Sequence, residues 1–340
     1  MTYRISLQPG EHQFEANSGQ TVLDAAQQAG LVLPHSCRDG ACGACKGKVL
    51  QGEVDHGHAS ESTLSADERA AGFALFCCAR PRSDLVVEAR NVSRAGDIVA
   101  RKLPSRVQKL ERLADDVMLI DLRLPASEDF RFRAGQYVDI LLSEGRRRSF
   151  SIANAPHDSG HLELHVRRVD GGSFTAQVFE TMKEKDILRI EGPLGAFWLR
   201  EDSSRPIVLV AGGTGFAPIK SLVEDAIERG LSRPISLYWG ARDRAGLYMD
   251  ALARSWESAL PGLRYVPVLS DAAADLEWTG RRGLVHQAVM DDFADLSGHE
   301  VYACGAPAMI DAARADFCNG RGLPEDAFFS DAFTFAAPGG

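Results

Sequence analysis

The stretch HSCRDGACGACKGKV, residues 35–49, holds three of the chain's seven cysteines. These three follow the pattern C-x4-C-x2-C, and a fourth thiol lies on a later segment, so that the set is Cys37, Cys42, Cys45 and Cys77. A secreted disulfide scaffold would be shorter and denser in cysteine. Clustering of this kind in a chain of 340 residues therefore indicates a metal site.

Two kinds of metal site fit four thiols at this spacing. C-x4-C-x2-C with a distant fourth cysteine holds a [2Fe-2S] cluster, and four cysteines also hold zinc. The residues between the thiols are small, and Gly40 and Gly43 can adopt positive φ, so the backbone can wrap closely and aim N–H groups at sulfide and thiolate. Zinc sites commonly use two C-x2-C pairs, whereas this chain has one. The pattern favours the cluster.

Together with FCCARPRSDLVVE, residues 76–88, the cysteine stretch resembles plant-type ferredoxins. The resemblance implies an α+β β-grasp domain over residues 1–92, with the cluster on the four thiols named above. Adjacent side chains on an extended segment diverge, so only one of Cys77 and Cys78 can face the iron. In that family the residue after the fourth ligand does not bind the cluster, which implies that Cys77 is the ligand and Cys78 is structural.

Patterns of hydrophobicity divide the rest of the chain. Within the polar segment RNVSRAGDIVARKLPS we expect a linker at residues 93–102. Residues 103–202 contain short alternating strands separated by turn residues, which predicts an antiparallel β-barrel. In residues 203–340 strands alternate with helices, which predicts an α/β doubly wound parallel sheet. The fold class is therefore multidomain.

The barrel segment contains two candidate phosphate sites. Residues 148–151, Arg-Ser-Phe-Ser, open a predicted strand, where an arginine can meet a phosphate, an aromatic can stack on a ring system and a serine can hydrogen-bond a ring nitrogen. Gly172 and Ser173 open the helix predicted at Phe174–Met182, and a helix N-terminus binds anions. Residues 148–151 alone suit an exposed basic turn before a half-buried strand equally well.

Two strand-to-helix turns stand out in the last segment. GGTGFAP, residues 212–218, follows the apolar strand Ile207–Ala211 and precedes a helix, the context of a dinucleotide-binding loop. CGAPAM, residues 304–309, places Cys304 at the C-terminal end of a strand, where ligands of such sheets bind. The simpler interpretations are a tight turn and an inert buried thiol.

RSFS, GGTGFAP and CGAPAM, in this order, resemble the ferredoxin–NADP reductase superfamily. The resemblance implies FAD bound with Arg148 on its pyrophosphate, Phe150 against the isoalloxazine and Ser151 near flavin N5. Phe150 stands where tyrosine is commoner, which removes a hydroxyl but keeps the stacking face. Gly172 and Ser173 would cradle the pyrophosphate.

The same resemblance implies a nicotinamide site. Cys304 would help place the nicotinamide C4 over flavin N5, and hydride transfer depends on that placement. The tail FFSDAF, residues 328–333, is similar to the family's tail, which implies that Phe333 shields the flavin and that Asp331 lies nearby, so the catalytic set is Ser151, Cys304 and Asp331. Residues implied to hold the dinucleotide are Gly212, Gly213, Thr214, Gly215, Pro218, Arg242, Gly305 and Pro307. Arg242 and its acidic neighbour Asp243 leave NADH and NADPH open, and the resemblance favours NADH.

The domain order resembles the reductase components of multicomponent oxygenases and is also similar to CDP-6-deoxy-glucoseen reductases of dideoxysugar synthesis. It implies electron flow from NADH to FAD, to the cluster, and to a protein partner that docks near residues 37–46, such as a Rieske or diiron oxygenase. The sugar-pathway alternative would deliver the electrons to a dehydrase. A non-enzymatic redox sensor is an alternative of another class, but it leaves RSFS, GGTGFAP and CGAPAM without a purpose.

Composition excludes other partners. The formal charge of -9 argues against nucleic acid, because phosphate binding needs a basic footprint. No run approaches the ~18 apolar residues that span a bilayer, and the N-terminus lacks the basic and apolar regions of a signal peptide. We therefore expect no membrane partner and a cytoplasmic protein.

Overall fold

In the computed structural model the chain divides into two compact units, one built on Met1–Val99 and the other on Ala100–Asp331. The structure describes residues 1–340 except 11, 90–91, 95–97, 272–274, 276 and 334–340. Residues 95–97 of the predicted linker and 334–340 of the predicted last domain therefore lie outside the described residues. Among the helices that are described, none has the length and apolarity needed to cross a membrane.

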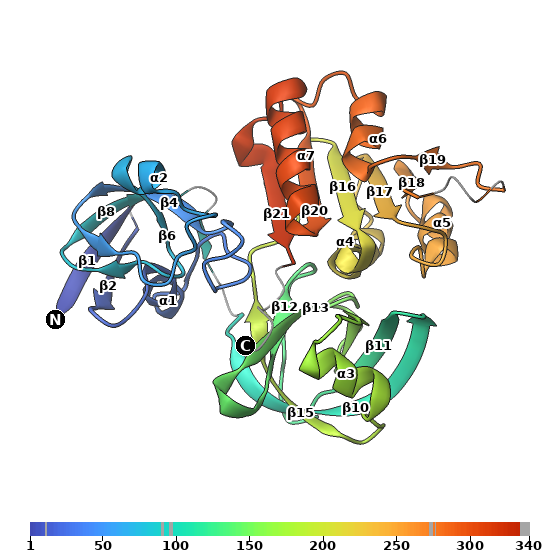
Figure 1. Ribbon diagram of the computed structural model, residues 1–340, viewed down its shortest axis with the longest axis horizontal. Coiled ribbons are helices and arrows are strands. Elements are labelled where there is room, and N and C mark those ends of the chain that lie inside the picture. Colours follow the sequence, from blue (N-terminus) through green and yellow to red (C-terminus); the bar gives the residue numbers. More distant parts are fainter. Residues whose placement is uncertain (11, 90–91, 95–97, 272–274, 276, 334–340) are drawn as a thin grey trace. The chain divides into compact units, whose positions relative to one another are not determined.

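The first unit is a mixed five-stranded sheet with a helix packed on it (Figure 1). Its strand order is β2-β1-β8-β4-β6, and β1 pairs antiparallel with β2 and parallel with β8. The strands are β1 (Thr2–Gln8), β2 (Gln13–Asn17), β4 (Lys46–Gln51), β6 (Phe73–Leu75) and β8 (Leu85–Glu88). Short pairs flank the sheet: β3 (Leu31–Val32) with β9 (Ser93–Arg94), and β5 (Val54–Asp55) with β7 (Arg80–Pro81). This is the ferredoxin-type fold that the resemblance implied.

Both helices of this unit begin at a capping residue. The Thr21 hydroxyl accepts the Asp24 N–H at the start of α1 (Val22–Gln28). Gly30, with φ of 73°, takes the left-handed conformation just after α1. Ser65 and Glu68 form a reciprocal capping box at the start of α2 (Ala66–Ala70). Local sequence signals thus set where both helices begin.

The second unit begins with a six-stranded antiparallel sheet in the order β13-β12-β15-β10-β11-β14. A bridge from Ile152 to Leu164 links its two outer strands, which closes the sheet into a barrel. Apolar side chains from every wall fill the interior, among them Val138, Ile140, Leu162, Leu164 and Ile190. The elements are β10 (Arg101–Ala114), β11 (Val117–Arg123), β12 (Tyr137–Leu141), the short η1 (Ser143–Gly145), β13 (Arg147–Ser151), β14 (His161–Arg167), α3 (Ser173–Glu180) and β15 (Ile187–Leu194).

β10 starts earlier than the sequence suggested. It is long and curved (Figure 1) and begins at Arg101, inside the segment predicted as a linker. Leu103, Ser105 and Val107 face inward, whereas the residues between them are exposed. Because those outward residues are proline and charged side chains, the two-residue alternation is hard to see in the sequence.

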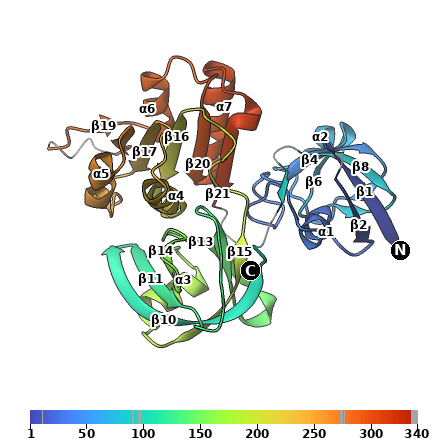
Figure 2. The ribbon, with the colours of Figure 1, turned by 180° about the vertical axis from the view of Figure 1, so that it is seen from behind.

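The unit continues with a parallel sheet in the order β19-β18-β17-β16-β20-β21. Its helices form two pairs, α4 with α5 and α6 with α7 (Figure 2). The strands are β16 (Ile207–Gly212), β17 (Ile235–Ala241), β18 (Leu263–Leu269), β19 (Arg281–Arg282), β20 (Glu300–Gly305) and β21 (Phe328–Ala332). The helices are η2 (Gly213–Gly215), α4 (Phe216–Glu228), α5 (Asp250–Ala259), α6 (Val285–Asp292), α7 (Pro307–Gly320) and η3 (Glu325–Ala327). The predicted alternation is confirmed, and the predicted tail contributes a strand beside β20.

Candidate functional site

The four predicted cluster thiols lie in two pairs. Cys45 Sγ lies 3.2 Å from Cys77 Sγ, and Cys37 is hydrogen-bonded to Cys42. Within the part of the chain that is described, no three His, Cys, Asp or Glu side chains converge on a single metal position. A [2Fe-2S] cluster takes four thiolates across two irons, whereas zinc needs four ligands around one point. Two pairs therefore fit a two-iron cluster.

The loop that carries three of these thiols turns repeatedly through the left-handed region. Arg38, Gly40 and Gly43 have φ of 59°, 68° and 73°. A Cβ on Gly40 would lie 2.7 Å from Cys78 Sγ and 3.2 Å from Ala59 Cα, so only glycine fits there. The turns direct backbone N–H groups at sulfur, as with the Asp39 N–H, whose nitrogen lies 3.4 Å from Cys37 Sγ.

One thiol of each pair is held as a thiolate. The hydrogen bond from Cys42, together with backbone N–H groups, lowers the pKa of Cys37 to about 6. Hydrogen bonds from Cys45 and Cys78 lower the pKa of Cys77 to about 3. The same hydrogen bonds raise the pKa of Cys42 and of Cys45, so each pair holds one thiolate and one thiol. Iron binds thiolates, so binding of a cluster would displace the two remaining protons.

The predicted flavin residues lie on β13 and at the start of α3. By strand alternation Arg148 and Phe150 share one face of β13, and buried Ser151 lies on the other. The Phe150 and Phe174 ring centroids are 5.4 Å apart, which brings the RSFS strand to the first turn of α3. No described side chain caps that turn, whose N-cap is Gly172. An arginine beside an uncapped helix N-terminus suits a pyrophosphate.

The two predicted nucleotide motifs lie side by side, because β16 pairs with β20. A Cβ on Gly215 would lie 2.1 Å from the Cys304 carbonyl oxygen, and one on Gly212 would lie 2.5 Å from Met309 Sδ. The atom met at Gly215 belongs to the backbone, so the absence of a side chain there is a condition for the contact between the two turns, whereas the Met309 side chain can move away from Gly212. Pro218 is buried within the first turns of α4, and Pro307 opens α7.

Cys304 is fully buried at the end of β20. Burial, followed by the negative charge of buried Asp331 on the neighbouring strand, raises the pKa of this thiol well above its usual range. Cys304 is therefore a neutral thiol and not a nucleophile. Phe333 is half-buried and follows directly after β21.

Comparison with known proteins matches this arrangement part by part. Three family models cover the chain in order: the 2Fe-2S iron-sulfur cluster binding domain at residues 5–82, the oxidoreductase FAD-binding domain at 104–198 and the oxidoreductase NAD-binding domain at 209–315. The chain is 43% identical to the CDP-6-deoxy-L-threo-D-glycero-4-hexulose-3-dehydrase reductase of Yersinia pestis, over 98% of this chain and 99% of that one. It is 37% identical to reductase component 2 of the terephthalate 1,2-dioxygenase of a Comamonas species, over 100% and 99% of the two chains.

A solved structure agrees over the same length. The Amycolatopsis cytochrome P450 reductase GcoB aligns with a TM-score of 0.82 and 38% identity, covering 98% of this chain and 100% of that one. The chain belongs to the iron–sulfur flavoprotein reductases. The reductase is thus an NADH-dependent oxidoreductase that carries FAD and a [2Fe-2S] cluster. These matches favour the cluster over zinc and an enzyme over a redox sensor.

Arg167 is a site candidate that the sequence analysis did not identify. It is the last residue of β14, and its guanidinium carbon lies 3.5 Å from the position of a Cβ on Gly213 in the dinucleotide loop. Its Nη1 pairs with Asp116 at 3.2 Å, but its Nε and Nη2 atoms are buried and have no hydrogen-bond partner among the described residues. Burial of hydrogen-bond donors without a partner costs free energy, and an anion bound at this position would satisfy them.

A buried polar network joins the barrel of the reductase to α4 and the segment before α5. His165 Nε2 lies 2.7 Å from Glu163, and Tyr248 Oη lies 3.0 Å from His165 Nδ1. Lys220 of α4 lies 3.3 Å from Glu163. Burial opposes ionisation of Glu163, but His165 and Lys220 outweigh it and lower the pKa of this carboxyl to about 2. The network holds α4, and with it the preceding dinucleotide loop, against the barrel.

The two arginines after β17 differ in their contacts. Arg244 forms a bidentate ion pair with Asp275, in which Nε lies 2.5 Å from Oδ2 and Nη2 lies 3.0 Å from Oδ1. The predicted nucleotide residue Arg242 is exposed. Arg244 is therefore already neutralised and is a poorer partner for a 2′-phosphate than exposed Arg242.

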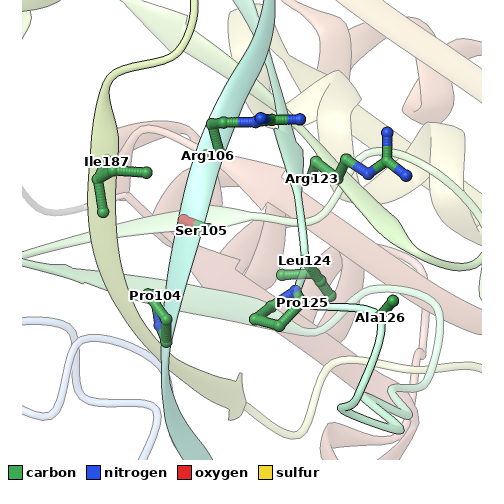
Figure 3. Close-up of a pocket in the computed structure, with 8 residues that line it drawn as sticks. All are labelled: Pro104, Ser105, Arg106, Arg123, Leu124, Pro125, Ala126 and Ile187. Atoms are coloured by element: carbon green, nitrogen blue, oxygen red, sulfur yellow. The ribbon is translucent and has the colours of Figure 1, made fainter.

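A groove of about 430 Å³ on the barrel lies between β10, β11 and β15 (Figure 3). Its lining consists of Pro104, Ser105, Arg106, Arg123, Leu124, Pro125, Ala126 and Ile187. None of these is a predicted site residue, so the groove is not part of the candidate redox site of the reductase.

Proposed function

We propose that the reductase delivers electrons one at a time to the terminal component of a multicomponent oxygenase, which docks near residues 37–46. The observation that carries this proposal is the full-length similarity to a dioxygenase reductase component and a cytochrome P450 reductase. Cys37 and Cys42 are half-buried, whereas Cys45 and Cys77 are buried. One edge of the site is thus accessible to an acceptor, and a transient redox encounter needs only a small interface, below about 1,200 Å².

A dehydrase is the second candidate acceptor. The Yersinia pestis relative, whose name assigns it to a hexulose dehydrase, has 43% identity, higher than the 37% of the dioxygenase component.

The residues of the second unit are proposed to hold the two dinucleotides in reacting positions. When bound, FAD accepts a hydride and releases single electrons, and the cluster carries one electron. Arg148 and the backbone of Gly172 and Ser173 bind the FAD pyrophosphate, while Phe150 packs against the flavin ring and Ser151 offers a hydroxyl near flavin N5.

The nucleotide side is assigned in the same way. The backbone of residues 212–215, with Arg167 above Gly213, binds the phosphates of NADH. Neutral Cys304 contacts the nicotinamide without reacting with it, because its thiol is not ionised. Asp331 helps to keep it neutral, and Phe333 shields the flavin. The Glu163–His165–Lys220 network keeps α4 in place.

Steady-state reduction of cytochrome c by NADH tests the proposed electron transfer. We expect turnover with flavin and cluster both loaded. The acceptor is then identified by coupling the reductase either to purified oxygenase components or to a hexulose dehydrase. Turnover with the dehydrase alone would replace the oxygenase proposal with the second candidate, and absence of cytochrome c reduction would remove the reductase mechanism.

Arg148→Ala is expected to weaken FAD retention about 10- to 100-fold, because a charge-assisted hydrogen bond contributes about 1.5–3 kcal/mol. NADH binding should change much less. FAD content after gel filtration and the NADH dissociation constant measure the two effects. Arg147→Ala is the matched control, since Arg147 lies on the other face of β13 and pairs with Glu191 at 2.6 Å. A larger loss of NADH binding than of FAD would contradict the assignment.

Arg167→Ala is expected to raise the KM for NADH about 10-fold or more, with FAD content unchanged, because it removes the donors that face the loop. Arg168→Ala is the control, since the Arg168 side chain pairs with Glu180 at 2.7 Å. Steady-state kinetics over a range of NADH concentrations measure the effect. Equal KM values in the two variants would show that Arg167 has no contact with the nucleotide.

A further inference from the structure

Cys78 is a fifth thiol in contact with the predicted cluster ligands. Its Sγ lies 3.6 Å from Cys77 Sγ, and it is buried. Cys77 is itself paired with Cys45 at 3.2 Å, so the ligand set is complete without Cys78. The thiol is also confined, because a Cβ on Gly40 would lie 2.7 Å from Cys78 Sγ.

Cys78 is also the buried end of a row of polar side chains that reaches the surface. His58 Nε2 lies 3.6 Å from Cys78 Sγ and 3.4 Å from Asp39 Oδ1. The side chains of His58 and Asp39 are 55% and 81% exposed. This row of side chains thus connects solvent, through an imidazole and a thiol, to the sulfur of a predicted ligand.

The direction of these hydrogen bonds follows from the chemistry of a cluster ligand. A cysteine that binds iron is a thiolate and carries no proton. Only Cys78 can then donate in the contact between the two sulfurs, as S–H to the Cys77 thiolate. His58 Nε2 faces both the Cys78 sulfur and Asp39 Oδ1, so an Nε2–H is shared between these two acceptors. The Cys78 S–H therefore points toward the cluster ligand Cys77.

We propose that Cys78 raises the reduction potential of the [2Fe-2S] cluster by donating a hydrogen bond to Cys77, and that His58 orients the Cys78 thiol. The inference rests on the proposed assignment of Cys77 as a ligand. Reduction adds one electron, and hence one negative charge, to the cluster and its thiolates. A donor to a ligand sulfur stabilises the more negative form, and hydrogen bonds to the sulfurs are among the factors that set such potentials. Cys78 acts through Cys77 and does not bind iron.

The test uses the full-length protein loaded with FAD and cluster. The midpoint potential of the cluster is measured by spectroelectrochemical titration, with iron content and the electron paramagnetic resonance spectrum as independent readouts. Cys78→Ala should lower the reduction equilibrium constant about 2- to 5-fold, which at 59 mV per tenfold change for one electron is about 20–40 mV. The flavin potential and the iron content should stay unchanged.

Three further variants make the result specific. Cys78→Ser keeps a donor and should lie closer to the wild-type potential than Cys78→Ala. His58→Ala should lower the potential by less than Cys78→Ala, because the thiol remains. Cys318→Ala removes a half-buried thiol of α7 in the second unit and should have no effect.

Two outcomes would overturn the inference, and they are distinguishable. An unchanged potential in Cys78→Ala with full iron content would mean that Cys78 only fills space, while the assignment of Cys77 stands. Loss of iron from both Cys78 variants, with FAD retained and Cys318→Ala intact, would mean that Cys78 is itself a ligand, and the assignment of Cys77 would fail as well.

Discussion

Cys42→Ser is expected to abolish the visible absorption of the cluster and to stop electron transfer to protein acceptors, while NADH still reduces ferricyanide through the flavin. Cys42 supplies half of one thiol pair, and serine replaces its soft sulfur with oxygen. Removing a group that only supports a metal ligand lowers metal affinity or activity ~10–100-fold. Removing a ligand itself should lower cluster binding by more than that. The absorption spectrum, the iron content and the two acceptor assays measure the effect.

Cys318→Ser is the matched control for this experiment, because it makes the same chemical change on a half-buried thiol in α7. It should leave the spectrum and both activities intact. A Cys42→Ser protein with an unchanged spectrum would refute the ligand role of Cys42. Loss of ferricyanide reduction as well would show that the flavin and the cluster depend on each other for binding.

Gly215→Ala is expected to reduce NADH turnover about 100-fold. The reason is that a displacement of the reacting groups by about 1 Å can lower the rate of a reaction by this factor. The new Cβ would lie 2.1 Å from the Cys304 carbonyl oxygen, 2.6 Å from its carbonyl carbon and 3.0 Å from the Gly305 nitrogen. All three atoms belong to the backbone, so no side-chain rotation relieves the overlap, and the two turns must separate. Overpacking of this kind also costs about 1–3 kcal/mol of unfolding free energy.

Gly298→Ala is the control for the glycine substitution. No described heavy atom lies within 4 Å of its added Cβ, and its φ is outside the left-handed region. Cluster and FAD content should be normal in both variants, and stopped-flow reduction of the flavin by NADH should be slow only in Gly215→Ala. A wild-type rate in that variant would contradict the close fit of the two nucleotide turns.

Much of the fold could be predicted from the sequence because its signals are local. Ser65 and Glu68 lie three positions apart and form a capping box, a pattern that can be identified in the sequence itself. The apolar strand Ile207–Ala211, followed by glycines, predicted the strand, loop and helix that the structure contains. The start of β10 at Arg101 was missed because its outward residues are charged and the inward alternation begins only at Leu103.

The parts of the site that could not be predicted are contacts between distant segments. Arg167 resembles any other polar residue of β14 until the fold brings it to Gly213. The contact of His165 with Tyr248 joins a barrel strand to the segment before α5. The family's pattern implies a structural Cys78, and its contacts with Cys77 and His58 depend on how the cysteine loop closes. The alternation of polar and apolar residues along HLELHVR predicts which side chains lie on the polar face of β14, but it does not predict which distant segment they contact.

Anaerobic titration with NADH, followed by electron paramagnetic resonance, tests the central claim most directly. One chain should carry electrons from NADH through FAD to a [2Fe-2S] cluster on Cys37, Cys42, Cys45 and Cys77. We predict that NADH alone produces the signal of a reduced [2Fe-2S] cluster in the wild-type protein and no such signal in Cys42→Ser. A flavin that NADH bleaches while the cluster stays oxidised, or a wild-type protein that contains zinc in place of iron, would contradict the account.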